Sequence, residues 1–142
     1  MTELPLIAAG GIASGGAIAE TLAVGAVGAQ VGSALLLATE AGTAAPHRQA
    51  LESDRETRLT RAFTGRRARG ITNRFMVDYD AFAPRGYPEV HYLTAPIRAA
   101  AREAGDAEGI NLWAGTAYRA AEEASASELV ERWNRELSAS GR

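Results

Sequence analysis

The sequence predicts an α/β fold in which two parallel strands flank a helix. Two short apolar runs each end in glycine. Between them lies a stretch whose apolar residues recur at helical spacing. The whole arrangement takes about thirty residues, which is typical of a βαβ unit. We therefore expect two parallel strands whose carboxyl ends lie at the same edge of a sheet.

The two predicted strands are residues 4–9, LPLIAA, and residues 26–32, AVGAQVG. Gly10 and Gly11 end the first run, and the second run ends in glycine as well. A short, continuous apolar run suits a strand that is buried on both faces, as parallel sheets require.

The helix between the strands is expected at residues 15–24, where Ile18 and Leu22 share a face and Gly25 supplies a C-cap. Start and stop signals predict further helices at residues 33–38, which open at Ser33, at residues 45–53, with Pro46 in the first turn, and at residues 93–104, which end at Gly105. An amphipathic helix is predicted at residues 118–138. The last of these carries Leu129, Val130, Trp133 and Leu137 on its apolar side.

The rest of the chain connects these helices. Residues 57–75 alternate and contain turn residues, so we expect irregular extended structure, and residues 79–90 contain two prolines and a glycine, so we expect a loop. No low-complexity linker divides the 142 residues, which we interpret as strands with their loops in residues 1–40 and an extension in residues 41–142.

The glycines that follow the strands predict a phosphate site. Glycine lets a ligand approach backbone N–H groups without a Cβ in the way, and a helix N-terminus that follows favours an anion. In (β/α)₈ barrels this site is frequently built from the loops after strands 7 and 8 and a short extra helix. Gly10-Gly11, then Gly32-Ser33 before SALLLA, appear in that order. The alternative is that the glycines merely end strands, but two such sites in this order favour a shared phosphate site.

Several motifs resemble one family. PLIAAGGIASGG, AVGAQVGS, APHRQAL, LTRAFTGRRARGITNRF and LWAGT, in this order, resemble the C-terminal portion of the nitronate monooxygenases, formerly called 2-nitropropane dioxygenases. The resemblance runs from residue 4 to about residue 138, and it implies an FMN-dependent (β/α)₈ barrel. This chain would then be a partial (β/α)₈ TIM barrel with the last two barrel strands and a C-terminal helical and extended extension. Flavin-dependent enoyl-acyl carrier protein reductases share the glycine motifs, but the arginine-rich segment is more similar to that of the nitronate enzymes.

The resemblance also implies a set of cofactor-binding residues. Glycine N–H groups after each strand would bind the FMN phosphate, and the Ser33 hydroxyl could donate to it. Thr116 replaces a glutamine of the family's LWAGQ segment, and Gln30 is either a cofactor contact or a satisfied buried glutamine. The implied set is Ala9, Gly10, Gly11, Gln30, Gly32, Ser33, Gly115 and Thr116.

The family reaction oxidises an alkyl nitronate with O₂ to a carbonyl compound and nitrite. The catalytic residues of the family precede this region, and a barrel needs about 200 residues or more. We therefore expect a fragment, from a split gene or a late start codon, that is inactive alone and depends on the missing N-terminal half of the barrel. The alternatives are an enoyl reductase-like fragment and a non-catalytic interaction module.

Composition excludes several other classes. The chain has no cysteine and no lysine, so thiol chemistry and Schiff bases are excluded and a cytoplasmic location is the simplest. Glycines and polar residues interrupt the uncharged stretch 21–39, which argues against a membrane span, and there is no basic signal-peptide region. His47 and His91 are expected to be structural or exposed, and no metal site is expected.

Eight arginines fall within residues 48–74, including RRARG. With Phe63, Phe75 and Tyr79 as stacking partners they could form a nucleic-acid patch. The net charge of −2 favours a solvated face instead.

Overall fold

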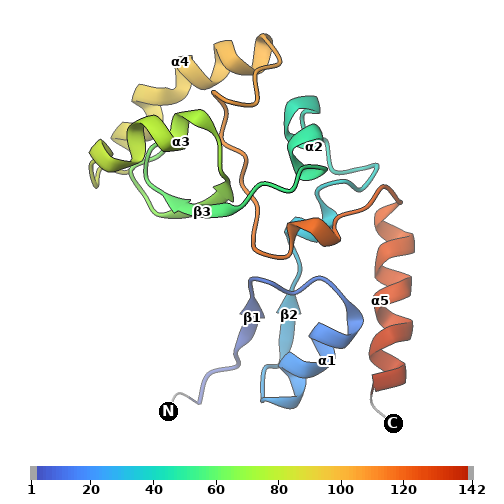
Figure 1. Cartoon of the computed structure of the whole chain (residues 1–142). Helices are drawn as coiled ribbons and strands as arrows, with labels where there is room; N and C mark the ends of the chain where they lie inside the picture. Colours follow the sequence, from blue (N-terminus) through green and yellow to red (C-terminus); the bar gives the residue numbers. More distant parts are fainter. Residues whose placement is uncertain (1–2, 141–142) are drawn as a thin grey trace. The chain divides into compact units, whose positions relative to one another are not determined.

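The computed structural model describes residues 3–140 and divides into two compact units. The first, the strand unit, combines residues 1–42 with residues 116–142, and the second, the hairpin unit, comprises residues 43–115. Figure 1 shows the elements of each unit.

The strand unit begins with strand β1 (Ile7–Ala9), helix α1 (Gly15–Ala23) and strand β2 (Gly28–Gln30). The strands are parallel, with Ile7 opposite Gly28 and Ala9 opposite Gln30, and their arrows lie side by side in Figure 1. The predicted strand, helix and parallel strand are therefore confirmed. Gly25 follows the helix with a φ of +101°, a left-handed conformation that glycine adopts readily.

Both strands are shorter than predicted, and in this chain they are not buried on both faces, in line with strands that lack their neighbours. The exposed fractions of Leu6, Ile7 and Val27 are 56%, 67% and 64%. A parallel sheet is normally covered on both faces. Among the described residues the sheet has only these two strands, so no further strand covers their side chains, and helix α1 packs against β2.

The predicted C-terminal helix begins later than expected, as helix α5 (Ala126–Ser140), and a single 3₁₀ turn, η3 (Tyr118–Ala120), precedes it. Ser125 starts α5 with a capping box, because its Oγ accepts from the Glu128 N–H and the Glu128 carboxylate accepts from the Ser125 N–H. The predicted helix at residues 33–38 is also only a 3₁₀ turn, η1 (Ser33–Leu35).

The core of the strand unit lies between α5 and the segment after β2. Leu129 and Trp133 are buried there with Ala34 and Ala38, so the core role expected for Trp133 is confirmed. The placement of Val130 on the apolar side is wrong, since this side chain is 53% exposed.

Helix α1 crosses α5 at very short range. A Cβ on Gly15 would lie 2.1 Å from the Trp133 carbonyl oxygen and 2.5 Å from the Glu136 Cβ. The Gly15 N–H donates to Glu136 Oε2 at 2.7 Å. The absence of a side chain at Gly15 therefore sets how closely the two helices pack.

The hairpin unit contains helix α2 (Ala45–Leu51) and an antiparallel pair, β3 (Thr57–Thr60) and β4 (Ala68–Ile71). Helix α3 (Arg74–Tyr79) follows at once, with Asn73 as its N-cap. The prediction of extended structure for residues 57–75 holds for the strands but missed this helix, because a six-residue helix shows little periodicity.

The unit continues with a 3₁₀ turn, η2 (Asp80–Phe82), and helix α4 (Glu89–Glu103). Helix α4 starts four residues before the prediction, inside the expected loop, and Gly105 follows it with a φ of +69°. The core contains Phe63, which is stacked on Phe75 with ring centroids 4.6 Å apart and meets Trp113 edge-on.

No helix within residues 3–140 combines the length and the apolar character needed to cross a bilayer. The longest, α4 and α5, have 15 residues each, whereas about 20 are needed.

Candidate functional site

The candidate site is the edge of the strand unit where β1 and β2 end. Because the strands are parallel and Ala9 pairs with Gln30, the residues that follow them emerge side by side, at the neighbouring-strand spacing of about 4.8 Å. Gly10 and Gly11 follow β1 directly, and Gly32 precedes the turn η1 after β2. We call these three residues the strand-end glycines.

All three strand-end glycines are exposed. Gly10 and Gly11 have φ values of +98° and +75°, which residues with a side chain rarely adopt. A Cβ on Gly10 or on Gly32 would meet no atom within 4 Å. The three N–H groups donate to no other residue in the described part of the chain. Chemically, such a set can bind an acceptor with several oxygens, such as a phosphate.

Two hydroxyl groups belong to the same unit. Ser33 is half-buried at the first position of η1. Thr116 is exposed, and its Oγ1 lies 3.4 Å from where a Cβ of Gly11 would be. Thr116 is therefore next to the first glycine pair, although 105 residues separate it from Gly11 in sequence.

The other residues of the expected cofactor set are placed differently. Ala9 and Gln30 are exposed at the ends of the paired strands, so the alternative of a satisfied buried glutamine is wrong for this chain. Gly115 is the last residue of the hairpin unit, so it belongs to a different unit from the other seven.

The N-terminus of α1 already has its own acceptors. The Ser14 hydroxyl accepts from the Ala17 N–H at 3.1 Å, and the Glu136 carboxylate accepts from the Gly15 N–H. A carboxylate at this position satisfies the positive end of the helix dipole. Two N–H groups in the first turn of α1 are thus already satisfied, whereas those of the strand-end glycines are not. Sequence reasoning missed Glu136, because 121 residues separate it from Gly15.

The two histidines belong to the hairpin unit, whereas the strand-end glycines belong to the strand unit. Burial lowers the pKa of His47, and a hydrogen bond with the Trp113 backbone acts in the opposite direction. Its buried Nε2 has no partner among the described residues. His91 Nδ1 is 3.1 Å from an Arg98 nitrogen, so it accepts from the guanidinium. The His91 contact is structural, whereas His47 keeps one buried nitrogen unsatisfied.

Two of the three aromatic side chains named for the nucleic-acid alternative are buried, and only Tyr79 is exposed. Phe63 and Phe75 are 0% and 9% exposed and stack on each other, so bases cannot reach their faces. Arg69 donates to the Thr57 carbonyl and hydroxyl oxygens across the hairpin, which gives it a structural role. Within residues 3–140, no group of acidic and histidine side chains is arranged to hold a metal ion.

A parallel strand pair with open glycine donors at one edge defines an α/β protein with a potential anion site. The family model described as nitronate monooxygenase matches residues 1–136, and the chain belongs to this family. It is 39% identical over 126 residues to a probable nitronate monooxygenase of Staphylococcus aureus (strain Newman), a match that covers 85% of this chain and 35% of that protein. A Staphylococcus saprophyticus relative with the same description is 36% identical over 134 residues and covers 91% and 38%.

Solved structures agree with this assignment. The nitroalkane oxidase from Streptomyces ansochromogenes superposes with a TM-score of 0.96 at 49% identity, over 99% of this chain and 41% of that one. FabK from Thermotoga maritima gives a TM-score of 0.79 at 22% identity over 99% and 46%, which shows a shared fold. The chain therefore spans between about a third and half of the length of these relatives.

Proposed function

We propose that this chain supplies the phosphate-binding part of an FMN-dependent nitronate monooxygenase. The whole protein would be a cytoplasmic enzyme that oxidises alkyl nitronates with O₂ to carbonyl compounds and nitrite. The observation that carries the proposal is the set of strand-end glycines, which are exposed and whose N–H groups have no partner in the described residues. The family assignment and the nitroalkane oxidase neighbour support the chemistry.

The residues present fit a phosphate group. Gly10, Gly11 and Gly32 would donate their N–H groups to its oxygens, and Ser33 would add a hydroxyl from the turn after β2. A Cβ at Gly32 would project into otherwise empty space, so this position keeps the edge open. When bound, FMN would supply the redox chemistry, while this chain holds and orients its phosphate end. Ala9, Gln30 and Thr116 would line the same edge, and Gly115 remains a prediction from the family resemblance.

We further propose that the whole chain is the C-terminal portion of a (β/α)₈ barrel and is inactive without the remaining strands. The exposed apolar side chains of Leu4, Leu6, Ile7 and Val27 support this, because a two-stranded parallel sheet needs neighbouring strands and helices to cover them. The relatives, which extend well beyond the matched region, have the length for such strands.

The test is co-expression of this chain with the part of the Streptomyces nitroalkane oxidase that precedes the matched region. We expect a complex with flavin absorbance at about 450 nm that releases nitrite from alkyl nitronates. Gly32→Ala should weaken FMN binding at least about tenfold, because its methyl group occupies the phosphate position.

Gly28→Ala is the matched control, since a Cβ at Gly28 only reaches ordinary contact, 4.0 Å from Ile7. It should leave the flavin in place. A folded complex without flavin would refute the proposal and favour a non-catalytic module. A yellow complex that reduces enoyl thioesters but leaves nitronates unchanged would favour the enoyl reductase alternative.

A further inference from the structure

Helix α4 buries an arginine whose hydrogen-bond acceptors are all neutral. Arg98 is 8% exposed. Its guanidinium donates to the Thr94 hydroxyl at 3.3 Å and to the Asn111 side-chain oxygen at 3.4 Å. It also donates to the carbonyl oxygen and to Nδ1 of His91, at 2.7 and 3.1 Å. No carboxylate within residues 3–140 forms an ion pair with it. A buried charge is costly unless an opposite charge lies beside it.

The nearest charge to Arg98 is positive as well. Burial lowers the pKa of Arg98, and the charge of Arg102, one helical turn further along α4, lowers this pKa too. No carboxylate of the described residues acts in the opposite direction. Arg102 is exposed, and its guanidinium has no partner in the described part of the chain. Two positive charges thus lie near each other without a negative charge that compensates for them.

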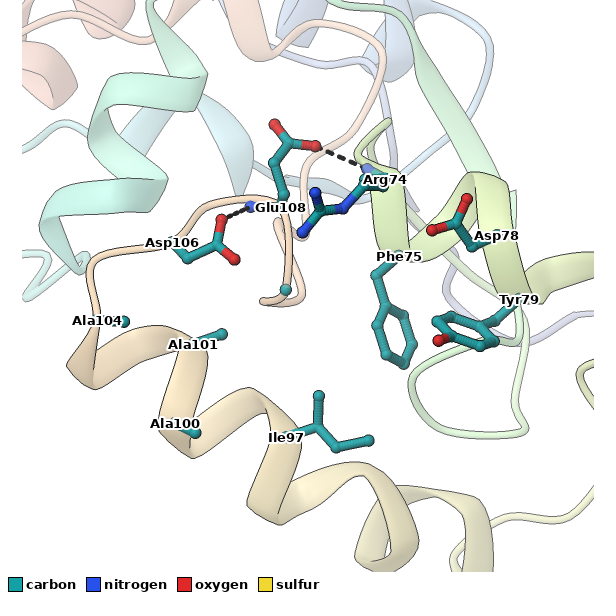
Figure 2. A pocket seen from close by; sticks show the side chains of 11 residues that line it. Arg74, Phe75, Asp78, Tyr79, Ile97, Ala100, Ala101, Ala104, Asp106 and Glu108 are labelled. Atoms are coloured by element: carbon teal, nitrogen blue, oxygen red, sulfur yellow. Dashed lines mark hydrogen bonds between the residues drawn. The ribbon is translucent and has the colours of Figure 1, made fainter.

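Acidic side chains of the hairpin unit lie on another face of α4. A pocket of about 400 Å³ is lined by Asp78, Asp106 and Glu108, and Figure 2 shows Ala100 of α4 at its margin. At about 100° per residue, Ala100 lies about 160° around the helix from both Arg98 and Arg102. The two arginines therefore point away from these acids.

His91 and Asn111 add only hydrogen-bond donors to the arginine face. A guanidinium has no lone pair, so His91 Nδ1 accepts from Arg98 and the neutral ring carries its proton on Nε2. The Asn111 side-chain oxygen also accepts from Arg98, which leaves the Nδ2 donors. Neither His91 Nε2 nor Asn111 Nδ2 has a partner among the described residues. Both are reachable from solvent, since neither is among the buried atoms that lack a partner.

We propose that these four side chains form a binding site for a carboxylate group. The site offers the fifth N–H of Arg98, the Arg102 guanidinium, His91 Nε2–H and the Asn111 amide, and it offers no free acceptor. A carboxylate has two oxygens with about four acceptor positions in one plane, and this geometry matches guanidinium donors. Its single negative charge compensates for the single buried guanidinium. A neutral ligand would satisfy the donors but leave that charge alone.

The carboxylate has two possible sources with the same chemistry. One is a small organic acid from solution. The other is an Asp or Glu side chain from the part of the relatives that lies outside the matched region, since this chain covers 35% of the Staphylococcus aureus protein and 41% of the nitroalkane oxidase.

Titration of the 142-residue chain with sodium acetate at constant ionic strength tests the site. In nuclear magnetic resonance spectra, the signals of the Arg98 Nε–H and of the His91 ring should shift together and saturate, with a Kd on the order of 10 mM. Shifts that are absent, or that stay linear up to about 200 mM acetate, would refute the proposal.

Two arginine variants separate the site from a general charge effect. Arg102→Gln should weaken acetate binding at least about tenfold, because it removes a charge-assisted hydrogen bond, and the exposed side chain has no described partner whose loss would disturb the fold. Arg135→Gln is the matched control, since Arg135 is an exposed arginine of helix α5 that likewise has no described partner. Equal weakening by both variants would overturn the site.

An internal carboxylate should occupy the same place. Asn111→Asp puts one beside the Arg98 guanidinium, so it should raise the midpoint of urea unfolding and abolish acetate binding. Asn134→Asp, at an exposed position of α5, should change neither. Acetate binding that survives in Asn111→Asp would contradict the proposed location.

The co-expressed complex with the preceding part of the Streptomyces nitroalkane oxidase distinguishes the two sources. If the complex binds acetate as the chain alone does, the ligand is a small organic acid. If only the chain alone binds acetate, an acidic side chain of the preceding part fills the site. Either result supports a carboxylate site, whereas an absence of acetate binding by both would refute it.

Discussion

Replacement of Gly15 by alanine should destabilise the chain sharply. The new methyl group would lie 2.1 Å from the Trp133 carbonyl oxygen and 2.8 Å from the Leu137 nitrogen, both of which are backbone atoms of α5 and cannot rotate away. Relief requires a shift of α5 by more than about 1 Å, at an overpacking cost of about 1–3 kcal/mol. The shift would also disturb the charged hydrogen bond from the Gly15 N–H to Glu136, worth about 1.5–3 kcal/mol.

Alanine recovers about 1 kcal/mol of helix propensity over glycine. We therefore expect a net loss of about 3 kcal/mol in the free energy of unfolding, measured by urea titration followed by circular dichroism. Gly16→Ala is the control in the same helical turn, because its nearest contact would be an ordinary 3.9 Å to Ser14 Oγ. It should be neutral or stabilising by up to about 1 kcal/mol. Equal stability of the two variants would show that α1 and α5 do not pack as closely as the structure has them.

Three other variants probe separate features. Trp133→Ala should cost about 3–5 kcal/mol in urea unfolding because it empties the buried core of the strand unit, whereas Val130→Ala, half-exposed on the same helix, should stay within about 0.5 kcal/mol. Gly70→Ala should cost about 1–3 kcal/mol, since its Cβ would lie 2.8 Å from a carbonyl oxygen of the neighbouring segment, and thermal unfolding measures this loss. Burial acts to raise the pKa of Asp80, but hydrogen bonds from Thr60 and the backbone lower it below its ordinary value of 3.8. The stability that Asp80 provides is therefore complete above that value and lost as pH falls through the lowered pKa. The stability of Asp80→Asn should match that of the original chain only in that acidic range, and unchanged pH curves would contradict the assignment.

Local sequence signals predicted much of the fold. The order of strand, helix and strand followed from apolar runs that end in glycine, and Gly25 and Gly105 marked the ends of two helices correctly. The predicted helix boundaries were less accurate where no glycine marks the end of a helix or strand. Helix α5 was predicted to start at residue 118, because the apolar spacing extends through a segment that folds as a 3₁₀ turn before the Ser125 cap.

The glycine edge could be located from sequence because its chemistry is backbone chemistry. Glycine after an apolar run indicates open N–H groups whatever the tertiary contacts are. The sequence contains no comparable signal for which side chains lie next to the glycines. The position of Thr116 beside Gly11 and the contact of Glu136 with α1 depend on segments more than 100 residues apart.

The sequence by itself determined the α/β class, the parallel strand pair and the glycines that follow it, because apolar periodicity and turn residues act over a few neighbouring positions. Only the tertiary structure decided which N–H groups remain open, since α1 turned out to use Glu136 as its own acceptor. The tertiary structure likewise decided that Phe63 and Phe75 are core residues and that α4 turns Leu93 and Ile97 to the outside. Burial depends on which surfaces meet, and that is a property of the packed chain as a whole.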